Sequence, residues 1–183
     1  MSHNSWKASL HQLLNQQTAE SRIAIVGIGN TLRSDDAAGI LIARTLKKTR
    51  AFPEPKPILI MDAGHAPENA TGELRSFAPD TVLLIDAVDM GEAPGTIRWV
   101  EMDEIEGMSA STHSLPLSML ASYLNWELKC DVNLLGIQLK TNDVGEIVSP
   151  EVLRAVDSVT RDVAGIISST YGVRFGVTPV GYS

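Results

Sequence analysis

Cysteine is almost absent from this sequence, since Cys130 is the only one among 183 residues. A single thiol excludes an intrachain disulfide and a zinc site built from several thiolates. We expect Cys130 to be a small core or surface residue rather than a nucleophile, because it lies between a predicted helix and a predicted strand.

Basic residues are also few, with 15 Lys and Arg against 22 Asp and Glu, a formal net charge of −7. This balance, with no basic run, predicts that nucleic acid is not a partner. The sequence lacks an apolar run of membrane-spanning length, a signal-peptide pattern and the G-x-S-x-G elbow of serine hydrolases. We therefore expect a cytoplasmic protein with no membrane partner. The length suits a single domain over 1–183, made of an N-terminal helix (1–20), a core (21–171) and a loose tail (172–183).

One stretch, I-A-I-V-G-I-G-N-T-L-R-S-D-D-A-A-G over residues 23–39, organises the rest. The β-branched run 23–26 predicts a strand buried on both faces, and Gly27 and Gly29 predict a sharp turn after it. Ser34 is a suitable helix N-cap, which would place Asp35 and Asp36 in the first turn of a helix.

This glycine turn differs from the turns that bind phosphate. The third glycine position of the dinucleotide fingerprint is Leu32, and the P-loop lysine is missing. Asp35 and Asp36 would repel a phosphate, whereas two carboxylates suit a cation. The plain alternative is that both acids only complement the helix dipole.

Strands alternate with helices along the chain. Further strands are predicted over 58–61, 81–85, 96–102 and 132–139. Helices are predicted over 5–19 and 35–48. Two more helices are predicted to begin at residue 111, with Pro116 in the first turn, and after an N-cap at Ser149. This alternation predicts an α/β protein with a mostly parallel sheet and helices on both faces. Sites in such sheets lie at the carboxyl ends of the strands.

Eight polar residues are expected at that edge: Asn30, Asp35, Asp36, Asp62, His65, Asp86, Asp89 and His113. Carboxylates with an imidazole suit zinc, nickel or another transition metal, and carboxylates alone can act as general acid and base. The structural alternatives are a capped turn at Asp86 and a surface or capping role for His113. His65, close to Asp62, is a competing ligand.

Six motifs together resemble the maturation endopeptidases of [NiFe]-hydrogenases. They are V-G-I-G-N-T-L-R-S-D-D (26–36), L-L-I-D-A-V-D (83–89), P-G-T (94–96), S-T-H-S-L-P-L (111–117), L-L-G-I-Q (134–138) and S-P-E-V (149–152). The resemblance implies a three-layer α/β/α fold. It also implies that the protein removes a short C-terminal tail from the hydrogenase large-subunit precursor, once nickel has been inserted.

The resemblance further implies roles for named residues. Asp36, Asp86 and His113 would be the catalytic and metal-associated trio, around a nickel ion that the substrate supplies; zinc or another divalent metal is possible in the isolated protein. Gly27, Gly29 and Asn30 would position the peptide, and Asp62 would bind or orient it. Two alternatives stay open: a non-catalytic nickel- or partner-binding module on the same fold, and a different metallohydrolase. We expect a monomer.

Overall fold

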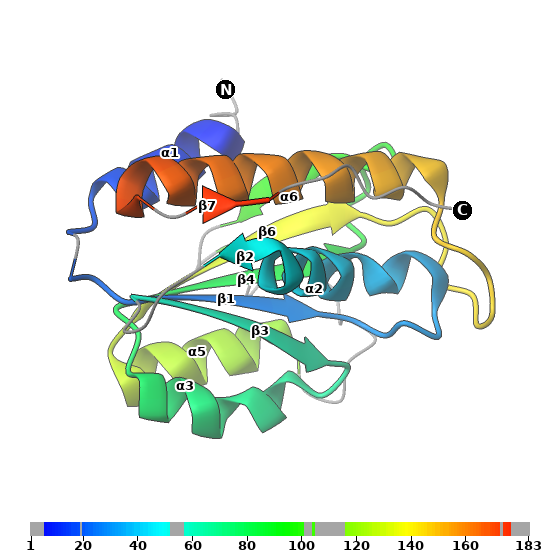
Figure 1. The fold of residues 1–183 in the computed structure, drawn as a ribbon. Helices are drawn as coiled ribbons and strands as arrows, with labels where there is room; N and C mark the ends of the chain where they lie inside the picture. The colour runs from blue at the N-terminus through cyan, green and yellow to red at the C-terminus, as the bar shows by residue number, and fades with distance from the viewer. Residues whose placement is uncertain are drawn as a thin grey trace.

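The structure, a computed structural model, describes residues 6–18, 20–51, 57–100, 104, 116–172 and 174–176. Its centre is a five-stranded sheet with the strand order β3-β1-β4-β6-β5 (Figure 1). The strands are β1 (Ile23–Ile28), β3 (Ile58–Gly64), β4 (Thr81–Val88), β5 (Ile97–Val100) and β6 (Asp131–Gln138). Four of them are parallel, and the edge strand β5 is antiparallel to β6. The predicted mostly parallel sheet is confirmed.

The central strands β1 and β4 are buried along their whole length, because helices cover both faces of the sheet. Alternate side chains of a strand face opposite sides. Ile23 and Ile25 therefore join the apolar cluster on one face, and Ala24 and Val26 join the cluster on the other.

The two helical layers complete a three-layer α/β/α fold. The first face is covered by α1 (Trp6–Asn15), α2 (Ala38–Thr49) and α6 (Pro150–Tyr171), and the second by α3 (Thr71–Phe77) and α5 (Leu117–Leu128). Single 3-10 turns, η1 (Ser34–Ala37) and η2 (Pro67–Ala70), precede α2 and α3. Among the described residues, no helix combines the length and apolar character needed to cross a bilayer.

Three predicted boundaries were wrong. β3 and β4 continue to Gly64 and Val88, so Asp62 and Asp86 lie inside strands rather than after them. The strands continue because their neighbours still offer partners: Asp62 pairs with Gly27, and Asp86 with Gly136. The helix α5 begins at Leu117 after an extended Pro116, while residues 111–115 lie outside the described part of the chain.

The chain end was predicted to be a loose tail from residue 172 onward, and this is wrong for two residues. β7 (Arg174–Phe175) pairs antiparallel with β2 (Arg50–Ala51), the segment that follows α2. Strand-forming residues near the end of the chain thus find a backbone partner. Residues 173 and 177–183 lie outside the described residues.

Candidate active site at the carboxyl edge of the sheet

Asp36 and Asp86 lie at the carboxyl edge of the sheet, where the sequence predicted a site. Asp86 is in β4 and is fully buried, with an exposed fraction of 0%. Asp36 is in η1, the turn between β1 and α2, and is 2% exposed. Because η1 contacts β4, the two elements that carry these carboxylates lie side by side at the edge.

Two glycines permit this close approach. A Cβ atom on Gly29, where φ is 141°, would lie 1.7 Å from the carbonyl oxygen of Asp36. A Cβ atom on Gly39 would lie 2.1 Å from the carbonyl oxygen of Ile85 and 2.4 Å from that of Ile28. Only glycine fits at such distances, so the start of the α2 segment rests directly on β1 and β4, beside Asp86.

The other predicted peptide-positioning groups have structural partners. A Cβ atom on Gly27 would lie 2.1 Å from the carbonyl oxygen of Gly39, so Gly27 is the contact point between β1 and α2. The N–H of Gly29 donates to the carbonyl of Gly64 at 3.0 Å. The N–H of Asn30 donates to the carbonyl of Asp36 at 3.1 Å, and its Oδ1 accepts from the N–H of Leu32 at 3.0 Å.

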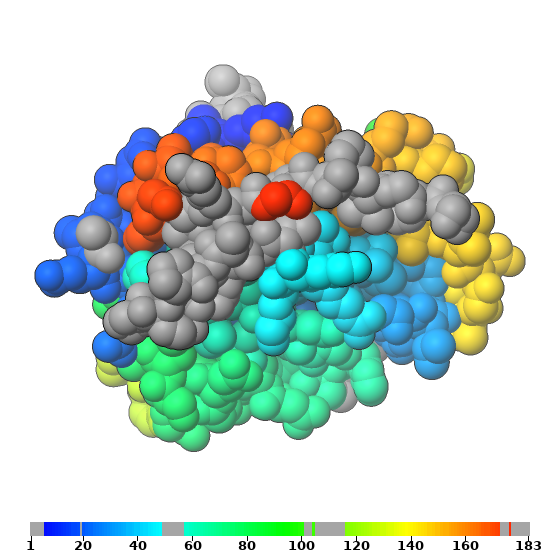
Figure 2. Space-filling model, viewed as in Figure 1, coloured from blue at the N-terminus to red at the C-terminus, as the bar shows by residue number. Residues whose placement is uncertain are grey.

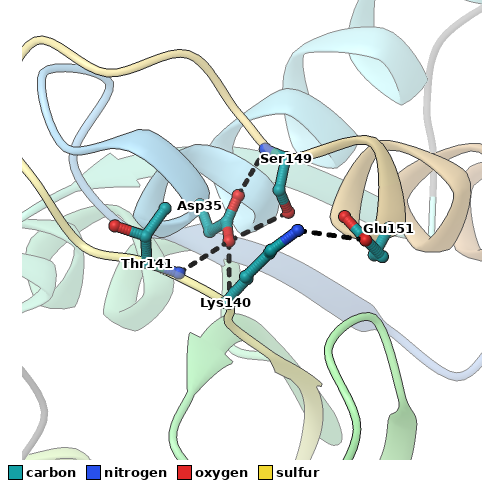
Figure 3. Close-up of polar contacts among 5 residues, drawn as sticks. All are labelled: Asp35, Lys140, Thr141, Ser149 and Glu151. Carbon is teal, nitrogen blue, oxygen red and sulfur yellow. Dashed lines mark hydrogen bonds and ion pairs between the residues drawn. The ribbon is translucent and has the colours of Figure 1, made fainter.

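Asp35 has a different environment from Asp36. Its carboxylate is 0% exposed and accepts hydrogen bonds from the N–H groups of Lys140 (2.8 Å), Thr141 (3.1 Å) and Ser149 (2.6 Å) and from the Ser149 hydroxyl (3.0 Å) (Figure 3). Four donors on one buried carboxylate compensate for its removal from water. Asp35 therefore joins η1 to both ends of the 140–149 segment.

Ser34 does not cap the helix as predicted. Its φ is 36°, a left-handed backbone conformation, and its hydroxyl donates to the carbonyl of Ile147 at 3.1 Å. The N-cap position of η1 is Arg33, which makes no side-chain capping bond. Ser149 is the N-cap of α6, as predicted, but its hydroxyl is directed to Asp35 instead of the helix.

Glu151 lies at the start of α6 beside this network. Lys140 Nζ is 3.1 Å from its Oε1. The backbone N–H of Glu151 itself, followed by the side chain of Lys140, holds the pKa of the Glu151 carboxyl below its ordinary value. This ion pair is at the surface and contributes little on its own.

Asp62 and His65 are on the same edge but farther along β3. Asp62 Oδ2 forms an ion pair with Arg44 Nε of α2 at 2.6 Å, and Oδ1 accepts from the N–H of Gly64 at 3.1 Å. His65 is exposed to solvent. Both oxygens of Asp62 thus have partners within the protein, which fixes its orientation.

Gln138, the last residue of β6, organises the loop that follows β4. Its Oε1 accepts from the N–H groups of Met90 (2.6 Å) and Glu92 (3.2 Å), and its Nε2 donates to Asp89 Oδ1 (3.1 Å). The bond from Gln138, followed by that from the N–H of Gly91, lowers the pKa of Asp89. Sequence reasoning assigned no role to Gln138; a polar residue closing an apolar strand was the available signal.

His113, the third member of the predicted trio, lies outside the described residues and stays a prediction. Within the described ranges, no group of three His, Cys, Asp or Glu side chains is arranged to hold a metal ion. What the described residues do provide is a pair of buried carboxylates on adjacent elements. Such a pair can contribute to cation binding or take part in proton transfer with a bound water.

A sequence model of the HycI family of hydrogenase maturation proteases matches residues 40–167. A protein of Methanocaldococcus jannaschii that bears the name of a hydrogenase maturation protease is 33% identical over 159 residues, or 85% of this chain and 94% of the relative. The hydrogenase 3 maturation protease of Escherichia coli K12 is 39% identical over 112 residues, or 61% of this chain and 69% of the relative.

A solved structure shows the same arrangement. The crystal structure of the [NiFe] hydrogenase maturation protease HycI from Thermococcus kodakarensis KOD1 superposes with a TM-score of 0.75 at 31% identity. The superposition covers 86% of this chain and 99% of that one.

Proposed function

Because this chain belongs to the hydrogenase maturation protease family, we propose that it removes the C-terminal tail of a [NiFe]-hydrogenase large-subunit precursor after nickel insertion. The resemblance drawn from the sequence motifs and the α/β fold are confirmed by the same comparisons. The chain is thus a peptidase. Its cleavage mechanism and the role of nickel are proposals.

The observation that carries the proposed mechanism is the burial of Asp36 and Asp86 at the carboxyl edge of the sheet. Two buried carboxylates on adjacent elements, at the strand ends where open α/β sheets carry their sites, suit proton transfer or cation binding. Asp35, with four hydrogen bonds, has a structural role. Asp36 and Asp86 are the acids that we assign to catalysis.

The start of α5 can be placed at the carboxyl edge of the sheet from the topology. Asp86 alternates along β4 with Leu84 and Val88, which belong to the apolar cluster that contains Leu117 of α5. Only two residues join the end of α5 to the amino end of β6, so the end of this helix lies at the amino edge of the sheet. Leu117, at the start of the helix, therefore lies toward the carboxyl edge. In the sequence His113 precedes Leu117 by four residues.

The nickel ion is proposed to belong to the substrate. Asp36, Asp86 and His113 would contribute ligands to an ion that is already held by the precursor, and mixed carboxylate and imidazole donors suit a transition metal. A bound nickel ion would polarise the scissile carbonyl. Recognition of the loaded ion would restrict cleavage to precursors that have completed nickel insertion.

The amide is hydrolysed by water. A carboxylate of the pair accepts a proton from the water while the water oxygen bonds to the carbonyl carbon. The carboxylic acid then returns that proton to the leaving nitrogen as the C–N bond breaks.

The Oδ1 of Asn30 accepts a hydrogen bond from the N–H of Leu32, and this bond orients the side-chain amide. Its Nδ2 has no hydrogen-bond partner among the described residues. We assign Nδ2 to the substrate carbonyl oxygen. Asp62, held by Arg44, would orient the peptide from the β3 side.

The test is an intact-mass measurement of nickel-loaded and nickel-free precursor after incubation with this protein. The proposal predicts loss of one C-terminal peptide from the loaded precursor only. A stable complex in which neither precursor is shortened would support the binding-module alternative. Equal shortening of both would contradict the role of nickel. Cleavage of unrelated peptides by a protein that keeps its own metal would support a different metallohydrolase.

The protein is also proposed to act as a cytoplasmic monomer. A single cut in a large partner needs only one active site, which a monomer can provide. Sedimentation of the purified protein at micromolar concentration tests this point, with a single species of about 20 kDa expected from the chain mass of 19.7 kDa.

A further inference from the structure

An exposed apolar patch lies beside the candidate active site. The described residues include five large apolar side chains that are strongly exposed: Leu32 (69%), Met119 (58%), Trp126 (70%), Val144 (70%) and Ile147 (84%). Leu32 is in the glycine turn, whereas Val144 and Ile147 are in the segment 140–148, which we call the rim loop. Figure 2 shows the rim loop (yellow) next to the turn (blue) at one end of the molecule. We call Leu32, Val144 and Ile147 the apolar rim.

Backbone contacts hold the rim loop against the turn. Arg33 and Val144 form an isolated antiparallel bridge, and the N–H of Gly145 donates to the carbonyl of Leu32 at 3.0 Å. The Ser34 hydroxyl donates to the carbonyl of Ile147 at 3.1 Å. The Gly145 bond is part of the bridge, so the apolar rim is fixed at two points, the bridge and the Ser34 hydroxyl.

Asp35 fixes the ends of the same loop. It accepts from Lys140 and Thr141 where the loop begins, and from Ser149 directly after its end. A loop tied at both ends and bridged in the middle has little freedom to fold its apolar side chains inward. Exposed apolar side chains on such a constrained loop are typical of binding surfaces.

The rim loop also carries negative charge. Asp143 and Glu146 are exposed and alternate in sequence with Val144 and Ile147. Two cations lie at this loop: Lys140 forms an ion pair with Glu151 at 3.1 Å, and Arg33 donates from Nη1 to the carbonyl of Asn142 at 3.3 Å. A partner segment complementary to this surface would contain apolar side chains, which contact the apolar rim, and Lys or Arg, which pair with Asp143 and Glu146.

The small size of the apolar rim argues against a second copy of this chain as its partner. A stable protein interface buries about 800 Å² on each side, or roughly 20–30 residues. Three apolar side chains are far fewer. They are sufficient to hold a short segment of a substrate next to its cleavage point, and Leu32 precedes the assigned catalytic Asp36 by only four residues.

We propose that the apolar rim, with Asp143 and Glu146, docks a segment of the hydrogenase precursor that contains both apolar and basic residues. This inference rests on the proposed function and adds a surface that selects the substrate. Docking at the rim places the scissile bond at the carboxyl edge of the sheet, so the rim acts mainly through binding and leaves the chemical step unchanged.

The test compares cleavage kinetics of the nickel-loaded precursor by the native protein and by rim variants. The double variant Val144→Ser/Ile147→Ser is expected to raise KM about tenfold with kcat within about twofold of the native value, because anchor residues at interfaces act through affinity. Trp126→Ser, near the other end of α5, is the matched control, since it removes an exposed apolar side chain elsewhere, and its KM is expected to stay within about twofold.

A pair of charge variants tests the chemistry of the partner. Ile147→Lys is expected to raise KM more than Ile147→Glu, because the segment is basic. Equal KM values for this pair, or a native KM for the double serine variant, would overturn the inference. A concentration-dependent dimer that dissociates in the double variant would instead assign the rim to self-association. If the native protein cleaves no precursor, the proposed function itself fails, which distinguishes the two.

Discussion

At Asp35 four donors converge on one carboxylate, and they come from residues more than 100 positions away in the chain. If an amide NH2 group replaced one carboxylate oxygen, it would face the N–H or O–H donors that this oxygen now accepts from, and those hydrogen bonds would be lost. Asp35→Asn is therefore expected to lower the free energy of unfolding by about 2–4 kcal/mol, measured by urea denaturation at neutral pH.

Ser149→Ala is the matched control for Asp35, since it removes only the hydroxyl donor and leaves the three backbone donors in place. We expect a loss of about 1 kcal/mol. A loss below 1 kcal/mol for Asp35→Asn would show that the carboxylate does not hold the rim loop to η1.

Cys130 is a residue whose predicted character is confirmed. Its side chain is 1% exposed, and Sγ lies 3.6 Å from the carbonyl oxygen of Leu124. Burial, together with the negative charges of Asp131 and Asp80, raises the pKa of the thiol, although its own backbone N–H lowers it. The thiolate fraction at neutral pH is therefore below that of a free cysteine.

This predicts slow alkylation of Cys130 by iodoacetamide in the native protein at pH 8, and fast alkylation in concentrated urea, followed by mass. Because the native pKa is raised, the native rate should still be rising with pH above the usual thiol range. Rapid native modification at pH 8 would contradict the buried position.

At the scale of elements, the contact of α2 with the sheet depends on Gly39. Gly39→Ala would place a methyl group against two backbone carbonyl oxygens, those of Ile85 and Ile28. We expect a loss of about 1–3 kcal/mol in the free energy of unfolding and a fall in kcat, because α2 and Asp36 must move away from β4. Thermal unfolding and cleavage kinetics measure the two effects.

Gly165→Ala is the control for this substitution. Gly165 lies inside α6, and a Cβ atom there would meet nothing within 4 Å. Alanine at a compatible helical position is expected to stabilise by about 0.5–1 kcal/mol. Equal effects of the two glycine substitutions would show that α2 does not rest closely on β1 and β4.

The elements also show which features the sequence could predict. β1 and β4 were predictable because an uninterrupted apolar run is a local property of the sequence. The location of Asp36 and Asp86 at the carboxyl edge was also predictable, because the ends of parallel strands lie at one edge of the sheet. The partner of Asp35 was not predictable, since nothing near residue 35 indicates a bond to Ser149. The left-handed conformation of Ser34 was missed for the same reason: it depends on the carbonyl of Ile147 across the rim loop.

At the scale of the whole molecule, the amino and carboxyl ends of the parallel strands differ in the residues that they carry. The amino end is closed by short structural contacts, such as the bond from the N–H of Arg22 to Asp80 Oδ2 at 2.8 Å. The carboxyl end holds the buried carboxylates, the glycine turn and the rim loop. Catalysis and recognition are therefore proposed for one end, and stability is provided along the strands.

Asp36 and Asp86 are proposed as the acids that act in cleavage of the precursor. Asn is nearly isosteric with Asp but cannot accept a proton in the same way, so Asp36→Asn and Asp86→Asn should each abolish cleavage, and His113→Ala should do the same. Asp131→Asn is the control, because Asp131 is exposed at the opposite end of the sheet, at the start of β6.

The most direct measurement is the intact mass of nickel-loaded precursor after incubation with Asp86→Asn, beside the native protein and Asp131→Asn, with circular dichroism to verify folding. We expect a full-length precursor with Asp86→Asn and a shortened one with the other two. A shortened precursor produced by folded Asp86→Asn at the native rate would contradict the role of Asp86 as a catalytic acid.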